Sequence, residues 1–288
     1  MMALTARRFF AVEATQVDPV EESEFFSGLK MRNGTFKLTR PSRFADLDAE
    51  IASAISERAG GIRQVLDVGA SIGSTTIDLA DFLRALGASP SVIGTDLFVD
   101  AHLVDLAPGL RVLTDADGWP LQYDIAGLAV RAWVRRLDYF TLAVAPLLIA
   151  RALLRPRLRR MVAEARTTPV KMESRALAGR SIQLVENDIF ALTPDFVGRF
   201  DFVRAANILN LSYFPADQLA VAIANIRSYC RGPGTLLLVL RSRGSKHDGT
   251  LFELRTDGKF DVRARVGEGS EVERLIVGDN AVATGSAS

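Results

Sequence analysis

From residue 63 onward, the chain alternates short apolar runs with segments of helical periodicity. The apolar runs are RQVLDVG, SVIGTDLF, SIQLVEND, FDFVRAAN and GTLLLVLRS, and the helical patterns are STTIDLADFLRALG and PADQLAVAIANIRSYCRG. Strands that alternate with helices pair in parallel, because each crossover helix returns the chain to the edge where the previous strand began. The sequence therefore predicts an α/β fold with three layers and a mostly parallel sheet.

The segments around this core predict additions to the sheet. Residues 250–277 alternate apolar and polar side chains around Asp257-Gly258, and residues 243–249 leave no room for a crossover helix, so antiparallel strands should complete the sheet. We expect three parts: an N-terminal cap over 1–60 with a hairpin and a helix, a core over 61–106 and 179–288, and an inserted hairpin and helical lid over 107–178.

Composition limits the function classes. The chain has 288 residues, 48% of them hydrophobic, and a net charge of +1, so no overall attraction to nucleic acid is expected. One cysteine, Cys230, excludes an internal disulfide, and two histidines are too few for a typical structural zinc site. The first residues do not resemble a secretory signal, and no apolar run reaches the ~20 residues of a membrane span. A cytoplasmic protein without a metal is expected.

The segment GASIG, residues 69–73, permits two interpretations. It matches the G-x-S-x-G turn of serine hydrolases, with Ser71 as nucleophile and His247 as the downstream histidine. It also suits a nucleoside site, in which Gly69 and Gly73 let a ligand approach the turn after the first strand.

The nucleoside interpretation finds further support in the second predicted strand. Asp96 stands at its end and would accept hydrogen bonds from two ribose hydroxyls, with Leu97 and Phe98 placed to flank an adenine ring. A dinucleotide enzyme would have G-x-G-x-x-G, whereas this chain has G-x-x-x-G. A ligand without a pyrophosphate is therefore favoured.

The segments VLDVGASIGSTT, VIGTDLF, LVENDIF and FDFVRAANILNLSYF, in this order, resemble the first four motifs of class I S-adenosylmethionine (SAM)-dependent methyltransferases. The resemblance covers residues 62–106 and 180–241 and implies a Rossmann-like fold with SAM as cofactor. It places the methionine end of SAM at Asp67 and Gly69, the ribose at Asp96, the adenine amino group at Asp188, and the sulfonium near Asn207. The full predicted cofactor site comprises Asp67, Gly69, Ala70, Ser71, Gly73, Asp96, Leu97, Asn187, Asp188, Ile189 and Asn207.

The methyl acceptor is less constrained. A sulfonium is already activated, so the protein mainly has to align the acceptor atom with the methyl group. His102 and Asn207 are the predicted catalytic residues, while His247 and Tyr123 are further candidates for proton transfer. The expected acceptor is a small molecule or a lipid-like compound.

The inserted segment 124–166 carries nine arginines and three acidic residues, and its stretch 139–150 has no charge. It suits a helical lid over the active site, a peripheral membrane contact, or a plain helical subdomain. Three alternatives to a small-molecule methyltransferase stay open: a Ser71 hydrolase, a non-catalytic adaptor that binds a membrane or a partner through this segment, and an RNA methyltransferase whose arginines contact phosphates.

Overall fold

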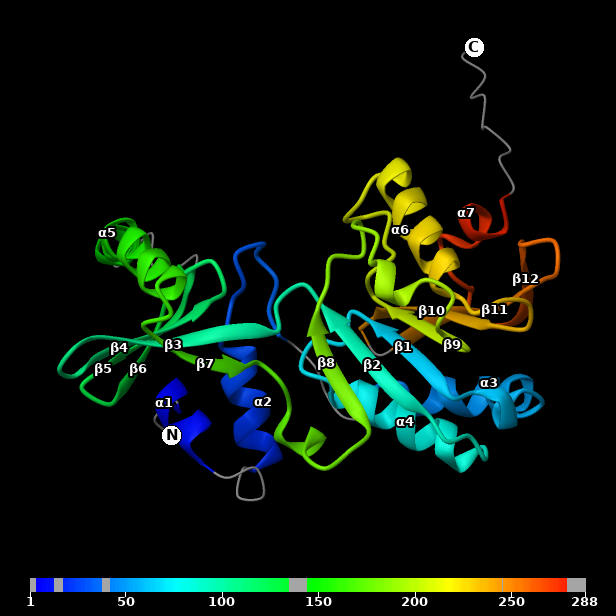
Figure 1. Cartoon of the computed structure of the whole chain (residues 1–288), viewed down its shortest axis with the longest axis horizontal. Helices are drawn as coiled ribbons and strands as arrows, with labels where there is room; N and C mark the ends of the chain where they lie inside the picture. The colour runs from blue at the N-terminus through cyan, green and yellow to red at the C-terminus, as the bar shows by residue number, and fades with distance from the viewer. Residues whose placement is uncertain (1–3, 13–17, 38–41, 135–143, 245, 279–288) are drawn as a thin grey trace, which may run out of the picture. The chain divides into compact units, whose positions relative to one another are not determined.

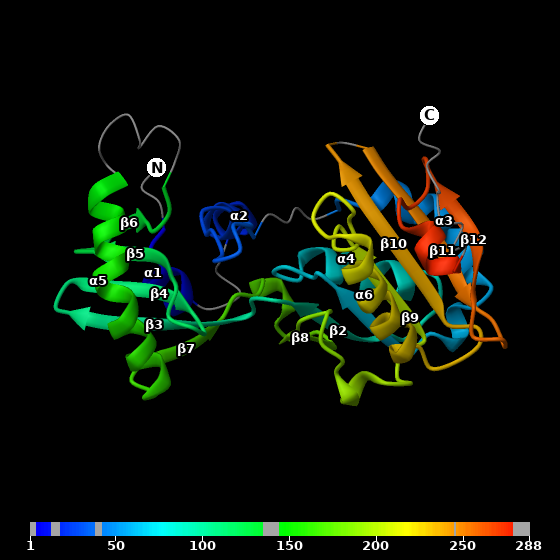
Figure 2. The same cartoon turned by 90° about the horizontal axis from the view of Figure 1, so that it is seen from above.

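The computed structural model describes residues 4–12, 18–37, 42–134, 144–244 and 246–278. The chain divides into two compact units, each with its own sheet (Figures 1 and 2). The large-sheet unit comprises residues 42–70, 75–97 and 180–288, and the small-sheet unit comprises 1–41, 71–74 and 98–179.

The large-sheet unit contains a seven-stranded sheet with the order β12-β11-β10-β9-β1-β2-β8. Strands β8, β2, β1, β9 and β10 pair in parallel, whereas β11 and β12 add antiparallel pairs at one edge. The predicted antiparallel strands at the C-terminal end of the sheet are therefore confirmed. The strands are β1 (Gln64–Val68), β2 (Ser91–Asp96), β8 (Ile182–Glu186), β9 (Phe202–Ala206), β10 (Leu236–Arg243), β11 (Lys246–Leu254) and β12 (Phe260–Val266).

Helices cover both faces of this sheet. Figure 1 shows α3 (Ala45–Ser56) and α4 (Ser74–Ala85) on one face, and α6 (Ala216–Tyr229) and α7 (Glu273–Val277) on the other. Successive residues of β10 alternate between the two faces: Leu238 packs with α3 and α4, and Leu237 with α6 and α7. The predicted three-layer, Rossmann-like α/β class is confirmed.

Gly94 in the middle of β2 allows close packing between the sheet and the start of α4. A Cβ atom at this position would lie 2.4 Å from Cδ2 of Leu184 and 3.0 Å from Cβ of Ala70. The Thr76 hydroxyl would be 3.5 Å away. The missing side chain therefore lets β8 and the turn after β1 approach β2.

The small-sheet unit contains a five-stranded antiparallel sheet with the order β6-β5-β4-β3-β7. Its aromatic cluster includes Phe9 and Phe25, whose rings stack with centroids 4.2 Å apart. The elements are α1 (Ala6–Ala11), α2 (Pro19–Ser27), β3 (Asp100–Ala107), β4 (Leu110–Asp115), β5 (Pro120–Ile125), β6 (Leu128–Arg131), α5 (Val144–Ala163) and β7 (Thr168–Lys171). Short 3₁₀ turns occupy Ala59–Gly61, Arg175–Leu177 and Pro194–Phe196 of the chain.

The unit boundaries differ from the predicted ones in two places. Residues 1–60 do not form one cap: 1–41 belong to the small-sheet unit, while α3 packs on the large sheet. The predicted hairpin of the inserted segment exists as β4 and β5, which turn at Asp117-Gly118, but it forms part of a five-stranded sheet that was not predicted. Residues 135–143 of the insertion lie outside the described part of the chain.

The packing around Gly94 predicts that Gly94→Ala lowers the free energy of unfolding by about 1 to 3 kcal/mol, because the new methyl group overpacks the core. Urea denaturation followed by circular dichroism measures this change. Gly60→Ala is the matched control, since a Cβ atom at Gly60 meets nothing within 4 Å. Equal stability of the two variants would show that the core near β2 can expand freely.

Candidate functional site

The carboxyl ends of β1, β2, β8 and β9 form one edge of the large sheet, called here the carboxyl edge, because these four strands run in parallel. The chain extends the sheet from β1 through β2 to β8 and then returns to the other side of β1 as β9. The strand order thus reverses between β1 and β9. In open α/β sheets, ligands bind at the carboxyl ends of the strands at such a reversal.

The turn after β1 lies directly beside the end of β2. The backbone N–H groups of Gly69 and Ala70 both donate to the carbonyl of Thr95, at 2.8 and 2.9 Å. Gly69 has a φ of +80°, and a Cβ atom there would lie 3.3 Å from the carbonyl oxygen of Ala206. The next residue after Thr95 is the half-buried Asp96. The structure therefore brings together the glycine turn and the predicted ribose-binding residue.

The segment after β8 adds more of the predicted residues to the carboxyl edge. The N–H of Asn187 donates to the Asp96 carbonyl at 2.9 Å, which joins the ends of β8 and β2. Asp188 is exposed, and its Oδ1 accepts from the N–H of Phe190 at 3.0 Å. Ile189 is buried, and Leu97 at the end of β2 is 39% exposed. An apolar surface and a carboxylate are thus available on neighbouring loops.

Asn207 directly follows β9 and has the left-handed φ of +61°. Its Oδ1 accepts from the N–H of Ser242 at 2.7 Å, and its own N–H donates to the carbonyl of Leu240 at 2.8 Å. The Ser242 hydroxyl lies 2.9 Å from Nδ1 of His247. Asn207 therefore fastens the end of β9 to β10, and its neighbourhood contains one of the two imidazoles.

Asp67 lies opposite Arg204 in the register of β1 and β9, and the two side chains form a buried ion pair. Arg204 Nε donates to Asp67 Oδ1 at 2.8 Å and Nη2 donates to Oδ2 at 2.7 Å. The hydroxyl of Thr76 also donates to Oδ2, at 2.6 Å, and Arg204 Nη2 donates to the carbonyl of Thr75 at 2.8 Å. Because both Asp67 oxygens have protein partners, its predicted contact with the methionine end of SAM stays a prediction.

Arg204 is the residue of this site that the sequence analysis missed. It is fully buried in β9, and its Nη1 has no hydrogen-bond partner among the described residues. The signal was the arginine within the apolar run FDFVRAAN, because a charge in a buried strand requires an opposite charge nearby. That signal indicates a carboxylate partner but does not identify which one.

Asp48 of α3 belongs to the same polar cluster. The pKa of its carboxyl group is raised from 3.8 to about 6, mainly by burial; the positive charge of Arg204 opposes this shift, and the negative charge of Asp78 adds to it. Burial also raises the pKa of Asp78. Asp48 is therefore expected to gain or lose its proton near pH 6.

Other predicted residues belong to the small-sheet unit. Ser71 has a φ of +58° and Gly73 of +87°, and the Lys37 ammonium donates to the carbonyl of Ser71 at 3.2 Å. His102 lies in β3, with Nδ1 2.9 Å from the hydroxyl of Thr167. The imidazoles of His102 and His247 thus lie within hydrogen-bond distance of other hydroxyls, those of Thr167 and Ser242, so a Ser71 hydrolase is not favoured.

Two further titratable side chains are deeply buried: the proton-transfer candidate Tyr123 and the single cysteine, Cys230. Burial raises the pKa of the Tyr123 phenol, whose hydroxyl has no hydrogen-bond partner among the described residues. Burial also raises the pKa of the Cys230 thiol to about 12, so this cysteine is unreactive near neutral pH. Within the described ranges, no three His, Cys, Asp or Glu side chains gather as a metal site, and no helix is long and apolar enough to cross a bilayer.

No protein family and no curated protein matches this chain. Solved structures that resemble it include a SAM-bound amino pentose methyltransferase from Micromonospora echinaspora involved in calicheamicin biosynthesis. That match has 14% sequence identity and a TM-score of 0.32, and it covers 73% of this chain and 63% of the other.

Two further matches are of similar quality. The CMeT domain of the citrinin polyketide synthase has 13% identity and a TM-score of 0.35, over 80% of this chain and 42% of the other. Phosphoethanolamine N-methyltransferase 2 of Haemonchus contortus, in complex with SAM, has 15% identity and a TM-score of 0.28, over 66% and 27%. This chain spans less than two thirds of each of these structures. At such TM-scores the matches transfer no activity to this chain.

The buried pair predicts that Arg204→Met lowers the free energy of unfolding by about 3 to 5 kcal/mol, because it leaves Asp67 charged and without its cation in the core. Urea denaturation is the measurement. The control is Arg255→Met, which removes the exposed Arg255–Asp261 pair and should cost less than about 1 kcal/mol. Similar losses in both variants would contradict a central role of the buried pair.

The Asp48 carboxyl group predicts a pH-dependent effect of Asp48→Asn. Its pKa is about 6 in the folded chain and near 3.8 in the unfolded chain, so the folded state binds the proton more tightly, and this group's contribution to stability falls as pH rises from about 4 to about 6. Asp48→Asn should therefore stabilise the protein by about 1 to 3 kcal/mol at about pH 7.5, and by much less at about pH 4.5.

Urea denaturation at the two pH values checks this expectation. Asp46→Asn is the matched control, because Asp46 is exposed in the first turn of the same helix. A gain from Asp48→Asn that does not depend on pH would exclude titration of this carboxyl group as the cause.

Proposed function

We propose that this chain transfers a methyl group from SAM to a small-molecule or lipid-like acceptor. The observation that carries the proposal is the contact between the turn after β1 and the end of β2. Two N–H groups of that turn donate to Thr95, and the ribose-binding candidate Asp96 follows at once. A glycine turn beside an acidic strand end suits a nucleoside, because the turn lets the ligand approach and the carboxylate accepts from the ribose hydroxyls.

The side chains at the carboxyl edge fit the nucleoside half of SAM. The Asp96 carboxylate is an acceptor, which suits the donor hydroxyls of the ribose. Leu97 offers exposed apolar surface for one face of the adenine, and the exposed Asp188 offers an acceptor for its amino group. Asn187 and Ile189 flank Asp188 and complete this part of the predicted site.

The methionine half fits less directly. Asp67 would attract the cationic end of SAM, but its carboxylate already neutralises Arg204. We expect backbone groups of Gly69 and Ala70 and the side-chain amide of Asn207 to do more of the binding here than Asp67. The proposed site thus differs from one in which the acidic residue of the first motif itself contacts the cofactor.

The bound cofactor would supply a methyl group on a positively charged sulfur, which needs no further activation. The contribution of the chain is then to hold the acceptor in line with that methyl group and to exclude water. Asn207 is fixed by Ser242 and Leu240, so its position at the end of β9 is rigid. His102 belongs to the small-sheet unit, so its role as proton acceptor for an oxygen nucleophile stays a prediction.

The helix α5 supports a role of segment 124–166 in contacting an apolar acceptor or a membrane surface. Leu148, Ile149 and Leu153 are 47%, 58% and 72% exposed, and arginines occupy positions 155, 157, 159 and 160 of the same helix. An exposed aliphatic surface next to arginines suits a lid over a lipid-like acceptor or a peripheral contact with anionic lipids.

Isothermal titration calorimetry with SAM and S-adenosylhomocysteine tests the proposal. Asp96→Ala should weaken binding of both compounds by about 1 to 3 kcal/mol, because the two ribose hydroxyls lose a charged acceptor. Asp261→Ala, an exposed aspartate on the edge strand β12, is the control and should bind like the unmodified chain.

Saturable binding of both compounds, weakened only by Asp96→Ala, would support the proposed site. Absence of binding to the unmodified chain would refute the proposed methyltransferase activity and favour a non-catalytic adaptor. Binding that is insensitive to Asp96→Ala would remove this residue from the cofactor site.

A further inference from the structure

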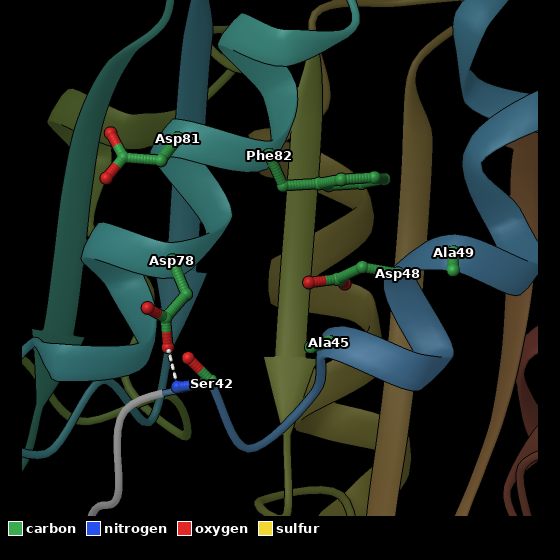
Figure 3. Close-up of a pocket in the computed structure, with 7 residues that line it drawn as sticks. All are labelled: Ser42, Ala45, Asp48, Ala49, Asp78, Asp81 and Phe82. Atoms are coloured by element: carbon green, nitrogen blue, oxygen red, sulfur yellow. Dashed lines mark hydrogen bonds between the residues drawn. The ribbon is translucent and has the colours of Figure 1, made fainter.

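A pocket of about 350 Å³ lies between α3 and α4 of the large-sheet unit (Figure 3). None of the residues that line it is among those predicted to bind SAM. Its lining consists of small residues, one aromatic ring and three carboxylates: Ser42, Ala45, Asp48, Ala49, Asp78, Asp81 and Phe82.

The Asp48 side chain is the unusual feature of this pocket. Only 6% of the residue is exposed, and its Oδ1 is buried without a hydrogen-bond partner among the described residues. Figure 3 shows the carboxylate of Asp48 projecting from α3 into the space between the two helices, with the Phe82 ring extending over the same space from α4. A buried acceptor that lacks a donor requires an explanation, because such groups are almost always satisfied.

The nearby charges do not satisfy this acceptor. The guanidinium of Arg204 forms its bidentate pair with Asp67, and Asp81 is paired with Arg84 and Arg180. Asp78 Oδ2 accepts only the backbone N–H of Ser42, at 2.7 Å, among the bonds that the described residues make.

The cluster therefore holds more negative than positive charge. This excess contributes to the raised pKa values of Asp48 and Asp78, which burial causes in the first place and which the cations Arg204 and Arg180 oppose. A cation that enters the pocket would lower both pKa values again, since it would stabilise both carboxylates in their ionised form.

We propose that the pocket between α3 and α4 binds a small organic cation, a primary alkylammonium group, between the carboxylates of Asp48 and Asp78 and the ring of Phe82. An ammonium group brings three donors, which suits a buried oxygen without a partner. A cation also gains from the face of an aromatic ring. A metal ion is a poorer occupant, because no three acidic or histidine side chains converge on one point in the described ranges.

Calorimetric titration of the full chain with n-butylammonium chloride tests the proposal, with sodium chloride of the same concentration in the cell and 1-butanol as the neutral probe. We expect saturable binding of the ammonium near pH 7.5, at least tenfold weaker binding to Asp48→Asn, and unchanged binding to the exposed control Asp46→Asn. Phe82→Leu keeps the carboxylates and should weaken binding several-fold.

Affinity should also fall at least tenfold between about pH 7.5 and pH 5, with proton release on binding near pH 6, because the ammonium and the proton compete for Asp48. The proposal is overturned if n-butylammonium gives no saturable heat, which would indicate that an ordered water alone satisfies Asp48. It is equally overturned if 1-butanol binds as well as the ammonium, or if Asp48→Asn binds it undiminished. Asp48→Asn is expected to fold, since it removes a destabilising charge, so loss of binding is not confused with loss of structure.

Discussion

The buried ion pair between Asp67 and Arg204 is the interaction on which the large-sheet unit most depends. It joins β1 to β9, the two strands between which the strand order reverses, and both side chains are only 1% exposed. Through Thr75 and Thr76 it also fixes the first turn of α4, which begins where the glycine turn ends. Burying two charges is costly, and the cost is offset here by a bidentate geometry with additional hydrogen bonds. The pair thus sets the geometry of the edge at which a nucleoside would bind.

The same pair changes how the aspartate of the first methyltransferase-like motif is interpreted. An aspartate before a glycine turn is naturally interpreted as a ligand for a cation, and here the cation is a protein side chain. The cofactor must then be recognised mainly through the nucleoside, by Asp96 and the loop after β8, and through backbone groups of the turn. On the face of the sheet that α3 and α4 cover, the remaining carboxylates Asp48 and Asp78 lack an equivalent cation, and this imbalance is the physical basis of the proposed ammonium site.

Local periodicity in the sequence correctly predicts several parts of the structure. The strands around Leu66, Ile93 and Val203, the helix of Leu219 and Ile223, and the antiparallel finish at β11 and β12 all follow from apolar spacing and turn residues. The five-stranded sheet of the small-sheet unit was missed except for one hairpin. Strands β6 and β7 have only four residues each, several strands carry partly exposed residues, and the partners β3 and β7 are separated in the sequence by β4, β5, β6 and α5.

The sequence alone determined the fold class, the position of the glycine turn, and the placement of Asp96, Asp188 and Asn207 at the ends of strands, because each depends on residue patterns within a few turns of chain. Only the tertiary structure decided that Asp67 is neutralised by Arg204, that Asp48 is buried without a donor, and that residues 1–41 join residues 98–179 rather than α3. The first outcome depends on two side chains that lie 137 residues apart in the sequence, and the other two depend on packing between elements that do not follow one another in the chain. Long-range charge pairing leaves no periodic trace in a single sequence, whereas helices and strands do.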